Sequence, residues 1–277
     1  MLKLLTKKYL ICSDIDGTLL RQDQTVSKKT RDLIQTLEKD GHIFSISTGR
    51  MYRSAREVGF QVSSSGHVIA SNGSYAAIRD EQLLKTTLEE KAIRSTYDIM
   101  SDFDLPLFFF STNTLFYTKE PPAFFQNLAD KSRLDTGHNS FSLVSINEKG
   151  IFDENMHQFL NAIVVAEEDA SKLTEVRAAL NEANGIRVLS SHHNNLEILP
   201  ANSDKKTAVE ALGKHYNIPR ERIITFGDGE NDIGMLQYAG TGVAMANASD
   251  NVKAAANHLT DTNEADGVYK FLKEFIS

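Results

Sequence analysis

The sequence predicts an α/β protein with a doubly wound, mostly parallel, Rossmann-like core sheet and an inserted α+β domain. Short apolar runs alternate with helix-like segments at both ends of the chain, which is typical of a parallel sheet covered by helices. The middle of the chain has a different rhythm. At 277 residues, the chain is also longer than the ~100–200 residues of a typical domain.

The first part of the chain alternates between strand and helix. The apolar run from Tyr9 to Ser13 ends at an acidic turn and indicates a buried strand. Ser27 is a suitable N-cap for a helix that ends near Asp40, with Gly41 as the stop signal. The expected elements are strands at 9–13, 42–47 and 67–70 and helices at 27–40 and 51–58.

The middle of the chain has its own strands, helices and aromatic cluster, Phe108-Phe109-Phe110. We expect helices at 89–100, 121–131 and 169–184 and strands at 107–110, 115–118, 141–146, 159–165 and 186–189. The sequence therefore predicts an inserted domain at 83–193, with a core built from 1–82 and 194–277.

The doubly wound rhythm returns after the apolar segment 196–200. We expect helices at 203–216, 231–238, 250–256 and 267–275 and strands at 222–226 and 242–245. The strand at 222–226 ends in a turn rich in glycine and aspartate, as the first strand ends in an acidic turn.

Composition narrows the choice of partner and compartment. The net charge of −7 argues against nucleic acid, because binding a phosphate backbone needs clustered Lys and Arg. Cys12 is the only cysteine, which excludes an intramolecular disulfide and fits a reducing cytoplasm. Lysines interrupt the apolar N-terminus, and no apolar run approaches ~18 residues, so neither a signal peptide nor a membrane span is expected. We expect a cytoplasmic monomer or homodimer.

The most informative motif is Asp14-Ile15-Asp16-Gly17-Thr18, directly after the first strand. Two carboxylates this close repel each other and need a cation or a shared proton. A hard, oxygen-seeking ion such as Mg²⁺ suits them. An acidic triplet alone could be a solvated turn, but its position at the end of a buried strand favours a site.

Three further segments lie where strands end or helices begin. Ser47-Thr48-Gly49-Arg50 can hold phosphate oxygens, although alone it could be a helix cap. Lys205, with Lys206 beside it, can neutralise phosphate, although most lysines are only solvated. Asp228 and Asp232 lie one helical turn apart in a glycine-framed loop that lacks the pattern of an EF-hand. Ligands of open α/β sheets bind outside the carboxyl ends of the strands, so these segments could converge.

Together, and in this order, the four segments resemble the haloacid dehalogenase (HAD) superfamily. Within it the chain resembles the Cof-type phosphatases, which carry a large α/β cap inserted after the third core strand. Ser71-Asn72-Gly73 and the segments 243–248 and 264–268 fit as well. The sequence departs from the family at Lys206 and Ala246, where glycine is usual. Neither departure removes a chemical group, but two adjacent lysines leave open which one reaches phosphate; the register of 207–209 favours Lys205.

The resemblance implies a mechanism. Asp14 would attack phosphorus and form an aspartyl-phosphate, and Asp16 would act as general acid and base. The cofactor would be Mg²⁺, held by Asp14, the Asp16 carbonyl, Asp228 and Asp232. The expected phosphate-binding residues are Ile15, Thr48, Gly49, Lys205 and Asn231.

The substrate would be a small phosphorylated metabolite: a sugar phosphate first, then pyridoxal phosphate or a nucleotide. The inserted domain would set specificity. Candidate residues for contact with the rest of the substrate are Arg50, Asn72, His192 and Asn195, together with His193 and Asn194.

Three alternatives remain open at this point. A phosphomutase or a catalytically idle phosphosugar-binding regulator could share the fold. A signalling receiver domain also clusters acids, Thr and Lys, but receivers lack a large insertion. Release of free phosphate from a generic ester would separate a phosphatase from all three.

Overall fold

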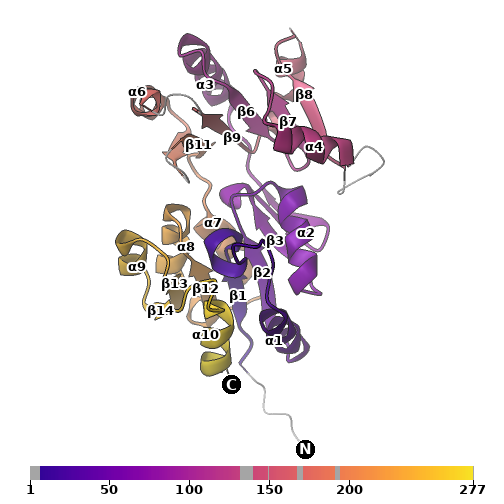
Figure 1. The fold of residues 1–277 in the computed structure, drawn as a ribbon, viewed down its shortest axis with the longest axis vertical. Helices are drawn as coiled ribbons and strands as arrows, with labels where there is room; N and C mark the ends of the chain where they lie inside the picture. Colours follow the sequence, from indigo (N-terminus) through magenta and orange to yellow (C-terminus); the bar gives the residue numbers. More distant parts are fainter. Residues whose placement is uncertain (1–6, 132–139, 149, 167–170, 191–193, 277) are drawn as a thin grey trace, which may run out of the picture. The chain divides into compact units, whose positions relative to one another are not determined.

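The computed structural model describes residues 7–131, 140–148, 150–166, 171–190 and 194–276. Its contacts divide the chain into two units (Figure 1). The first contains Met1–Arg50, Ser54–Leu84 and Asp204–Ser277, and the second contains Met51–Arg53 and Lys85–Ser203.

The first unit is built on an eight-stranded sheet with the order β14-β13-β12-β1-β2-β3-β4-β5. Its strands are β1 (Leu10–Ser13), β2 (Ile43–Ser47), β3 (His67–Ala70), β4 (Tyr75–Ile78), β5 (Glu81–Lys85), β12 (Ile223–Gly227), β13 (Thr241–Met245) and β14 (His258–Thr260). The pairs from β14 to β3 are parallel, and β4 runs antiparallel to β3. The doubly wound, mostly parallel sheet is therefore confirmed, and it places β1 and β12 side by side in its interior.

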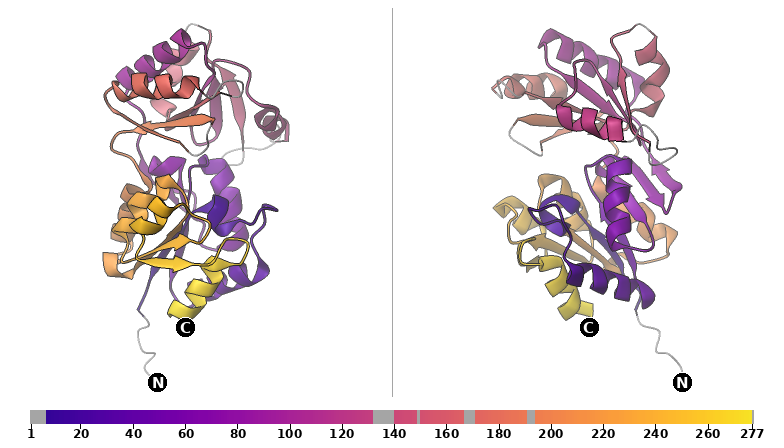
Figure 2. Two further views of the ribbon diagram at one scale, coloured as in Figure 1. Left: turned by 60° about the vertical axis from the view of Figure 1, so that its left-hand side comes forward. Right: turned by 45° about the vertical axis from the view of Figure 1, so that its right-hand side comes forward.

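Helices cover both faces of this sheet (Figures 1 and 2). They are α1 (Lys28–Lys39), α2 (Tyr52–Val62), α7 (Lys205–His215), α8 (Ile233–Tyr238), α9 (Asp250–Ala255) and α10 (Gly267–Ile276). On one face, Leu212 of α7 and Met235 of α8 share a buried core with Leu10 of β1. On the other, Phe271 of α10 lies edge-on to Phe226 of β12, with 5.6 Å between ring centroids.

The first helix begins and ends as its sequence predicts. The Ser27 hydroxyl accepts a hydrogen bond from the Thr30 amide at 3.2 Å and so caps the N-terminus of α1. After Lys39 the chain reaches Gly41, whose φ of +97° is the left-handed conformation that glycine adopts without strain.

The second unit contains a six-stranded, largely antiparallel sheet with the order β10-β11-β9-β6-β7-β8. Its strands are β6 (Leu107–Phe110), β7 (Thr114–Tyr117), β8 (Ser142–Ser145), β9 (Asn161–Val165), β10 (Ile186–Leu189) and β11 (Asn195–Pro200). Its helices are α3 (Glu90–Asp102), α4 (Ala123–Lys131), α5 (Ile151–Asn155) and α6 (Lys172–Asn181).

Three consecutive phenylalanines on β6 supply both faces of this second sheet. Phe109 points into a core formed with α3 and α6, where it stacks on Phe159 at 4.4 Å between centroids. Phe108 and Phe110 point to the other face, where Leu115 joins them. Strand side chains alternate between faces, so one apolar triplet contributes to two separate cores.

The structure contains elements that the sequence analysis missed and moves some boundaries. Strands β4, β5 and β14 and the helix α5 were not expected; each has five residues or fewer, and β5 and β14 are half exposed. Helix α2 continues past 58 to Val62, and Gly59 within it packs against Val68 and Ile46 of the sheet. The return boundary expected at 193 falls instead at Ser203, because β11 pairs with β9 and β10 of the second unit.

None of the helices in the described part of the chain has both the length and the apolar composition needed to cross a membrane.

Candidate active site

Asp14 and Lys205 form the centre of a buried charged cluster in the first unit. Asp14 follows β1, and its amide donates a hydrogen bond to the Phe226 carbonyl at the end of β12. The ammonium of Lys205, at the start of α7, donates to Asp14 Oδ1 and to Asp232 Oδ1, each at 2.6 Å. Lys205 is only 1% exposed, so its charge is balanced within the protein and not by water.

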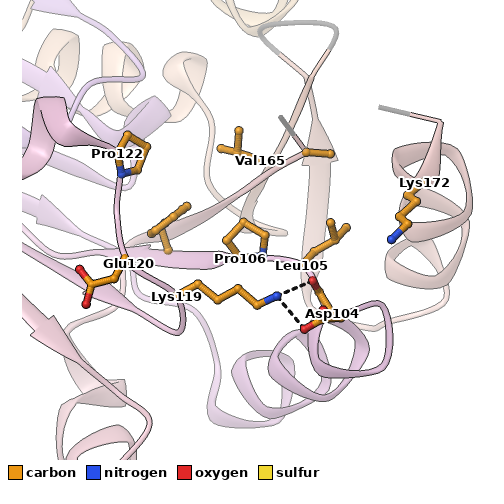
Figure 3. A pocket seen from close by; sticks show the side chains of 10 residues that line it. Asp104, Leu105, Pro106, Lys119, Glu120, Pro122, Val165 and Lys172 are labelled. Atoms are coloured by element: carbon orange, nitrogen blue, oxygen red, sulfur yellow. Dashed lines mark hydrogen bonds and ion pairs between the residues drawn. The ribbon is translucent and has the colours of Figure 1, made fainter. Parts of the chain in front are cut away.

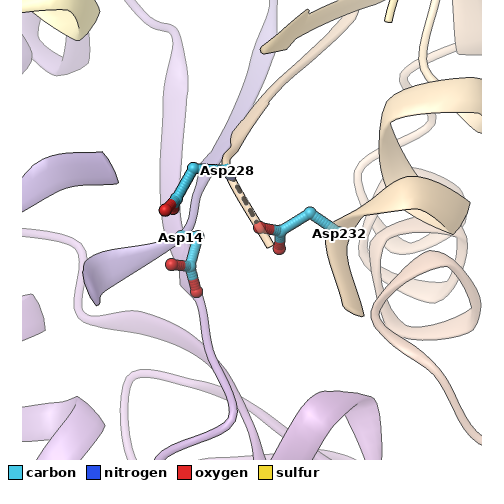
Figure 4. A group of neighbouring side chains, drawn as sticks. All are labelled: Asp14, Asp228 and Asp232. Atoms are coloured by element: carbon cyan, nitrogen blue, oxygen red, sulfur yellow. Dashed lines mark hydrogen bonds between the residues drawn. The ribbon is translucent and has the colours of Figure 1, made fainter. Parts of the chain in front are cut away.

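Asp14, Asp228 and Asp232 form the acidic side of this cluster (Figure 4). One carboxylate oxygen from each lies within 4.8 Å of the others. Asp232 is fixed because its Oδ2 accepts hydrogen bonds from the amides of Asp228 and Gly229, both at 2.9 Å. Three carboxylates against one ammonium leave an excess of negative charge, and hard oxygen donors are the ligands that Mg²⁺ prefers.

The electrostatics of the cluster favour an added cation. Burial raises the pKa of the Asp14 carboxyl to about 8, against the opposing charge of Lys205 and with a contribution from Asp232. Burial likewise raises the pKa of Asp228 to about 6, against the hydrogen bond from Thr18. Burial works against a charged Lys205, but the two carboxylates outweigh it and raise the pKa of that ammonium. A divalent ion would stabilise the ionised carboxylates.

Asp16 is not one of the three clustered acids. Its carboxylate is 52% exposed and is held by Arg50, whose Nε donates to Oδ2 at 2.7 Å and whose Nη2 donates to Oδ1 at 2.5 Å. Ile15, between the two aspartates, has a fully buried side chain, so only its backbone could meet a phosphate.

Thr48 and Gly49 lie at the end of β2 and are packed against the turn after β3. The backbone N–H of Asn72 donates a hydrogen bond to the Thr48 carbonyl at 3.0 Å. A Cβ at Gly49 would lie 3.2 Å from the Asn72 side chain. The Asn72 amide oxygen also accepts a hydrogen bond from Asn231 Nδ2 at 2.8 Å. The loops that follow β2, β3 and β12 therefore meet.

Sequence reasoning assigned no role to two residues that hold Asp228. Thr18 Oγ1 donates to Asp228 Oδ1 at 2.7 Å, and Asn247 Nδ2 donates to the Gly17 carbonyl at 2.8 Å and approaches Asp228 Oδ2 at 3.4 Å. A Cβ at Gly17 would lie 2.2 Å from Asp228 Oδ2. Thr18 and Asn247 both lie in segments that the sequence analysis singled out. The sequence did not indicate, however, that each of them would contact Asp228.

The remaining candidates differ in their placement. Lys206 is exposed, and its ammonium lies 5.9 Å from the Tyr238 ring centroid, so Lys205 is the lysine that meets Asp14. Asn195 is a buried residue of β11, opposite Val165 in the second sheet, and Asn194 precedes it. His192 and His193 lie outside the described residues.

A pocket of about 430 Å³ lies within the second unit (Figure 3). Its lining is apolar around Pro106 and Val165, and two of its charged residues pair with each other: the Lys119 ammonium donates to Asp104 Oδ1 at 2.6 Å. It contains none of the clustered acids. The three clustered acids all lie in the first unit.

Comparisons with known proteins agree with this geometry. A family model described as haloacid dehalogenase-like hydrolase matches residues 11–272. The 5-amino-6-(5-phospho-D-ribitylamino)uracil phosphatase YitU of Bacillus subtilis is 34% identical over 98% of this chain and 99% of its own. YcsE, a second 5-amino-6-(5-phospho-D-ribitylamino)uracil phosphatase of Bacillus subtilis, is 30% identical over 96% of this chain and 95% of its own.

Among solved structures, BT1666 of Bacteroides thetaiotaomicron, described among phosphatases of the HAD superfamily, superposes with a TM-score of 0.78. It is 25% identical and the match covers 99% of this chain and 97% of that one. The resemblance drawn from the four motifs is thus confirmed. The chain belongs to the haloacid dehalogenase-like hydrolase family and, like these relatives, is a phosphatase.

Proposed function

We propose that this phosphatase depends on Mg²⁺ and hydrolyses the phosphate ester of a small metabolite through an aspartyl-phosphate on Asp14. The observation that carries the proposal is the cluster in which Asp14, Asp228 and Asp232 lie within 4.8 Å of one another. Lys205 compensates only part of its charge.

The metal would be held by the carboxylates of Asp14, Asp228 and Asp232, with the Asp16 carbonyl as a further oxygen donor. When bound, Mg²⁺ supplies positive charge that offsets the repulsion between a carboxylate nucleophile and a phosphate dianion. The buried Lys205 adds a fixed ammonium next to the nucleophile.

The chain's own residues account for both steps of hydrolysis. An Asp14 carboxylate oxygen forms a bond to phosphorus while the bond from phosphorus to the ester oxygen breaks, and the leaving alkoxide takes a proton from Asp16. Asp16 then accepts a proton from water, while the water oxygen forms a bond to phosphorus and the bond from phosphorus to the Asp14 oxygen breaks. Inorganic phosphate leaves and the Asp14 carboxylate is restored.

Phosphate would be held by groups in the loops at the carboxyl ends of the strands and at the start of α7. These are the Ile15 backbone, Thr48, the Gly49 amide, Lys205 and Asn231. Donors placed where charge spreads in the transition state lower the barrier without further reorganisation.

For the substrate, we infer a phosphate carried on a sugar or polyol chain. Support comes from the two Bacillus subtilis relatives, whose names give a 5-phospho-D-ribityl group as the phosphorylated part of the substrate. We infer that the inserted domain, residues 83–193, selects among such esters. It contains none of the three clustered acids. Pyridoxal phosphate and nucleotides are second choices.

A phosphate-release screen tests this proposal. The full chain is incubated with 5-amino-6-(5-phospho-D-ribitylamino)uracil, a panel of sugar and polyol phosphates, pyridoxal phosphate and nucleotides, with Mg²⁺ or with EDTA. We expect free phosphate only with Mg²⁺ and none from Asp14→Asn. Turnover in EDTA would refute the metal role. Isomerised ester without free phosphate would indicate a mutase, and no reaction at all would indicate an idle binder.

A further inference from the structure

The turn after β3, Ser71–Gly73, has an unusual backbone for a segment with side chains. Ser71, Asn72 and Gly73 have φ values of +49°, +52° and +93°, so three successive residues are left-handed. Glycine accepts this conformation, but each non-glycine residue there costs on the order of 1 kcal/mol or more. Such a turn persists only where its surroundings hold it in place.

Contacts on two sides hold the turn. The Ser71 amide donates to the Arg50 carbonyl at 2.9 Å, and the Asn72 amide donates to the Thr48 carbonyl at 3.0 Å. On the other side, a Cβ at Gly73 would lie 2.0 Å from the Asp204 carbonyl oxygen, directly before Lys205. The turn therefore fits between the loop after β2 and the start of α7.

The side chain that this backbone presents is that of Asn72. It is 1% exposed and packs over Gly49, and its Oδ1 accepts the hydrogen bond from Asn231 Nδ2 at 2.8 Å. The two asparagines lie 159 residues apart in the sequence. Asn72 thus contacts both the loop after β2, through Gly49, and the loop after β12, through Asn231.

An amide can turn about its last side-chain bond, and only its nitrogen can donate a hydrogen bond. With Asn72 accepting one of its protons, the Asn231 amide has a fixed plane, and its second N–H has a fixed direction. A donor that is fixed before the reaction begins stabilises transition-state charge better than one that must reorient.

We propose that Asn72 is a positioning residue, which acts on catalysis by orienting the amide of Asn231 and not by touching substrate. The proposal rests on the proposed function, in which Asn231 donates to the transferring phosphoryl group. It replaces the expectation that Asn72 contacts the rest of the substrate. The strained turn is retained because it places the Asn72 acceptor at the meeting point of the three loops.

Asn72→Gly is the decisive variant, because glycine accepts the left-handed backbone and removes only the side chain. We expect kcat to fall about 10-fold to 100-fold with KM changed less than about 2-fold, and the melting temperature to stay level or rise. Ser71→Gly is the matched control: it relaxes the adjacent left-handed residue and removes a hydroxyl that has no partner, but it leaves the Asn72–Asn231 bond in place. Its kcat should equal that of wild type.

A double-mutant cycle then tests whether Asn72 acts through Asn231. In an Asn231→Ala background, Asn72→Gly should cost less than about 2-fold in kcat, because the residue it orients is already gone. Asn72→Asp keeps the acceptor oxygen, so its kcat should exceed that of Asn72→Gly, while its added negative charge raises KM.

Each outcome is decisive. Additive losses in the cycle, a wild-type kcat for Asn72→Gly, or an Asn72→Asp variant no better than Asn72→Gly would overturn the positioning role. Wild-type enzyme is assayed first with Mg²⁺ and the best ester of the screen. Failure there rejects the proposed function itself, whereas an active wild type with an additive cycle rejects only the role of Asn72.

Discussion

Arg50 grips both oxygens of the Asp16 carboxylate, with Nε donating to Oδ2 at 2.7 Å and Nη2 donating to Oδ1 at 2.5 Å. Arg50 Nη2 also donates to Gln24 Oε1 at 3.1 Å. The residue that we expected to contact substrate therefore holds the side chain to which we assign proton transfer. A planar guanidinium fixes a carboxylate in a way that a lysine ammonium does not.

Arg50→Lys should lower kcat/KM by about 10-fold to 100-fold, because the Asp16 carboxylate loses its fixed orientation while the local charge is kept. Steady-state kinetics on the best ester measures the effect. Arg56→Lys is the matched control, because Arg56 makes the same bidentate contact with Asp80 outside the acidic cluster. Its Nε donates to Oδ1 at 2.6 Å and its Nη2 donates to Oδ2 at 2.9 Å. Equal losses in the two variants would mean that the Asp16 pair has no special role.

Asp16→Asn should reduce the rate by about 10²–10⁴-fold, as loss of a general acid and base does, while the clustered acids can still bind metal. The defect should be smaller for esters whose leaving group needs no proton, so p-nitrophenyl phosphate and an alkyl phosphate are compared. Asp23→Asn, an exposed residue of the following loop, serves as the control. A rate near that of wild type would remove Asp16 from the mechanism.

Lys205→Met should lower the free energy of unfolding by about 3–5 kcal/mol without metal, because it leaves the Asp14 and Asp232 carboxylates buried without their partner. Mg²⁺ should recover part of this loss, since it binds the folded cluster and not the unfolded chain. Urea unfolding with and without Mg²⁺ measures both effects. Lys206→Met, at the exposed neighbour, should change the stability little; the reverse order would show that the wrong lysine has been chosen.

The stability should also depend on pH through His67, whose Nε2 lies 2.5 Å from the Tyr216 hydroxyl. Burial lowers the pKa of His67 to about 4. The unfolded chain, with an ordinary histidine pKa of about 6.5, therefore binds more protons between these two values. The contribution is complete above about pH 6.5 and is lost as the pH falls towards 4, by about 2–3 kcal/mol.

Unfolding free energies from pH 4 to 7 test this contribution. His67→Gln cannot titrate, so its stability should fall less steeply with acid than that of wild type. His157→Gln, at an exposed position, should keep the wild-type slope. Parallel curves for wild type and His67→Gln would contradict the assignment.

Exchanging the second unit for that of a relative should change the ranking of substrates while Asp14→Asn still abolishes turnover. The reason is that the acidic cluster and its lysine come from the first unit alone. Joining the new segment at Lys85 and Ser203 keeps β11 with its sheet partners. An unchanged ranking over the same panel of esters would place specificity in the first unit.

The parts of the site that could be predicted from the sequence are those written contiguously at strand ends. Asp14 and Asp228 follow β1 and β12, and adjacent parallel strands bring their carboxyl ends together whatever the rest of the fold does. The pairing of Asp16 with Arg50 and of Asn72 with Asn231 depends on side-chain directions within turns, one of them left-handed. No sequence periodicity records such directions.

The end of the second unit, expected at 193, lies at Ser203 for a related reason. The segment 196–200 reads as an apolar strand, and nothing local shows which sheet it joins. Its antiparallel partners, β9 and β10, determine that choice. Short edge strands such as β14 escape prediction because three residues carry too little pattern.

The central place of β1 has a consequence for how the protein is made. A ribosome delivers β1 and β2 early, but β12, the other neighbour of β1, is encoded after the whole second unit. At a translation rate of about 5–20 residues per second, roughly 10–40 s pass between the synthesis of β1 and that of β12, and one edge of β1 stays unpaired during this time. In that interval the nascent chain carries an open, apolar strand edge, the kind of surface that chaperones shield from other chains. Asp14, the proposed nucleophile, is thus synthesised long before β12 completes the site around it.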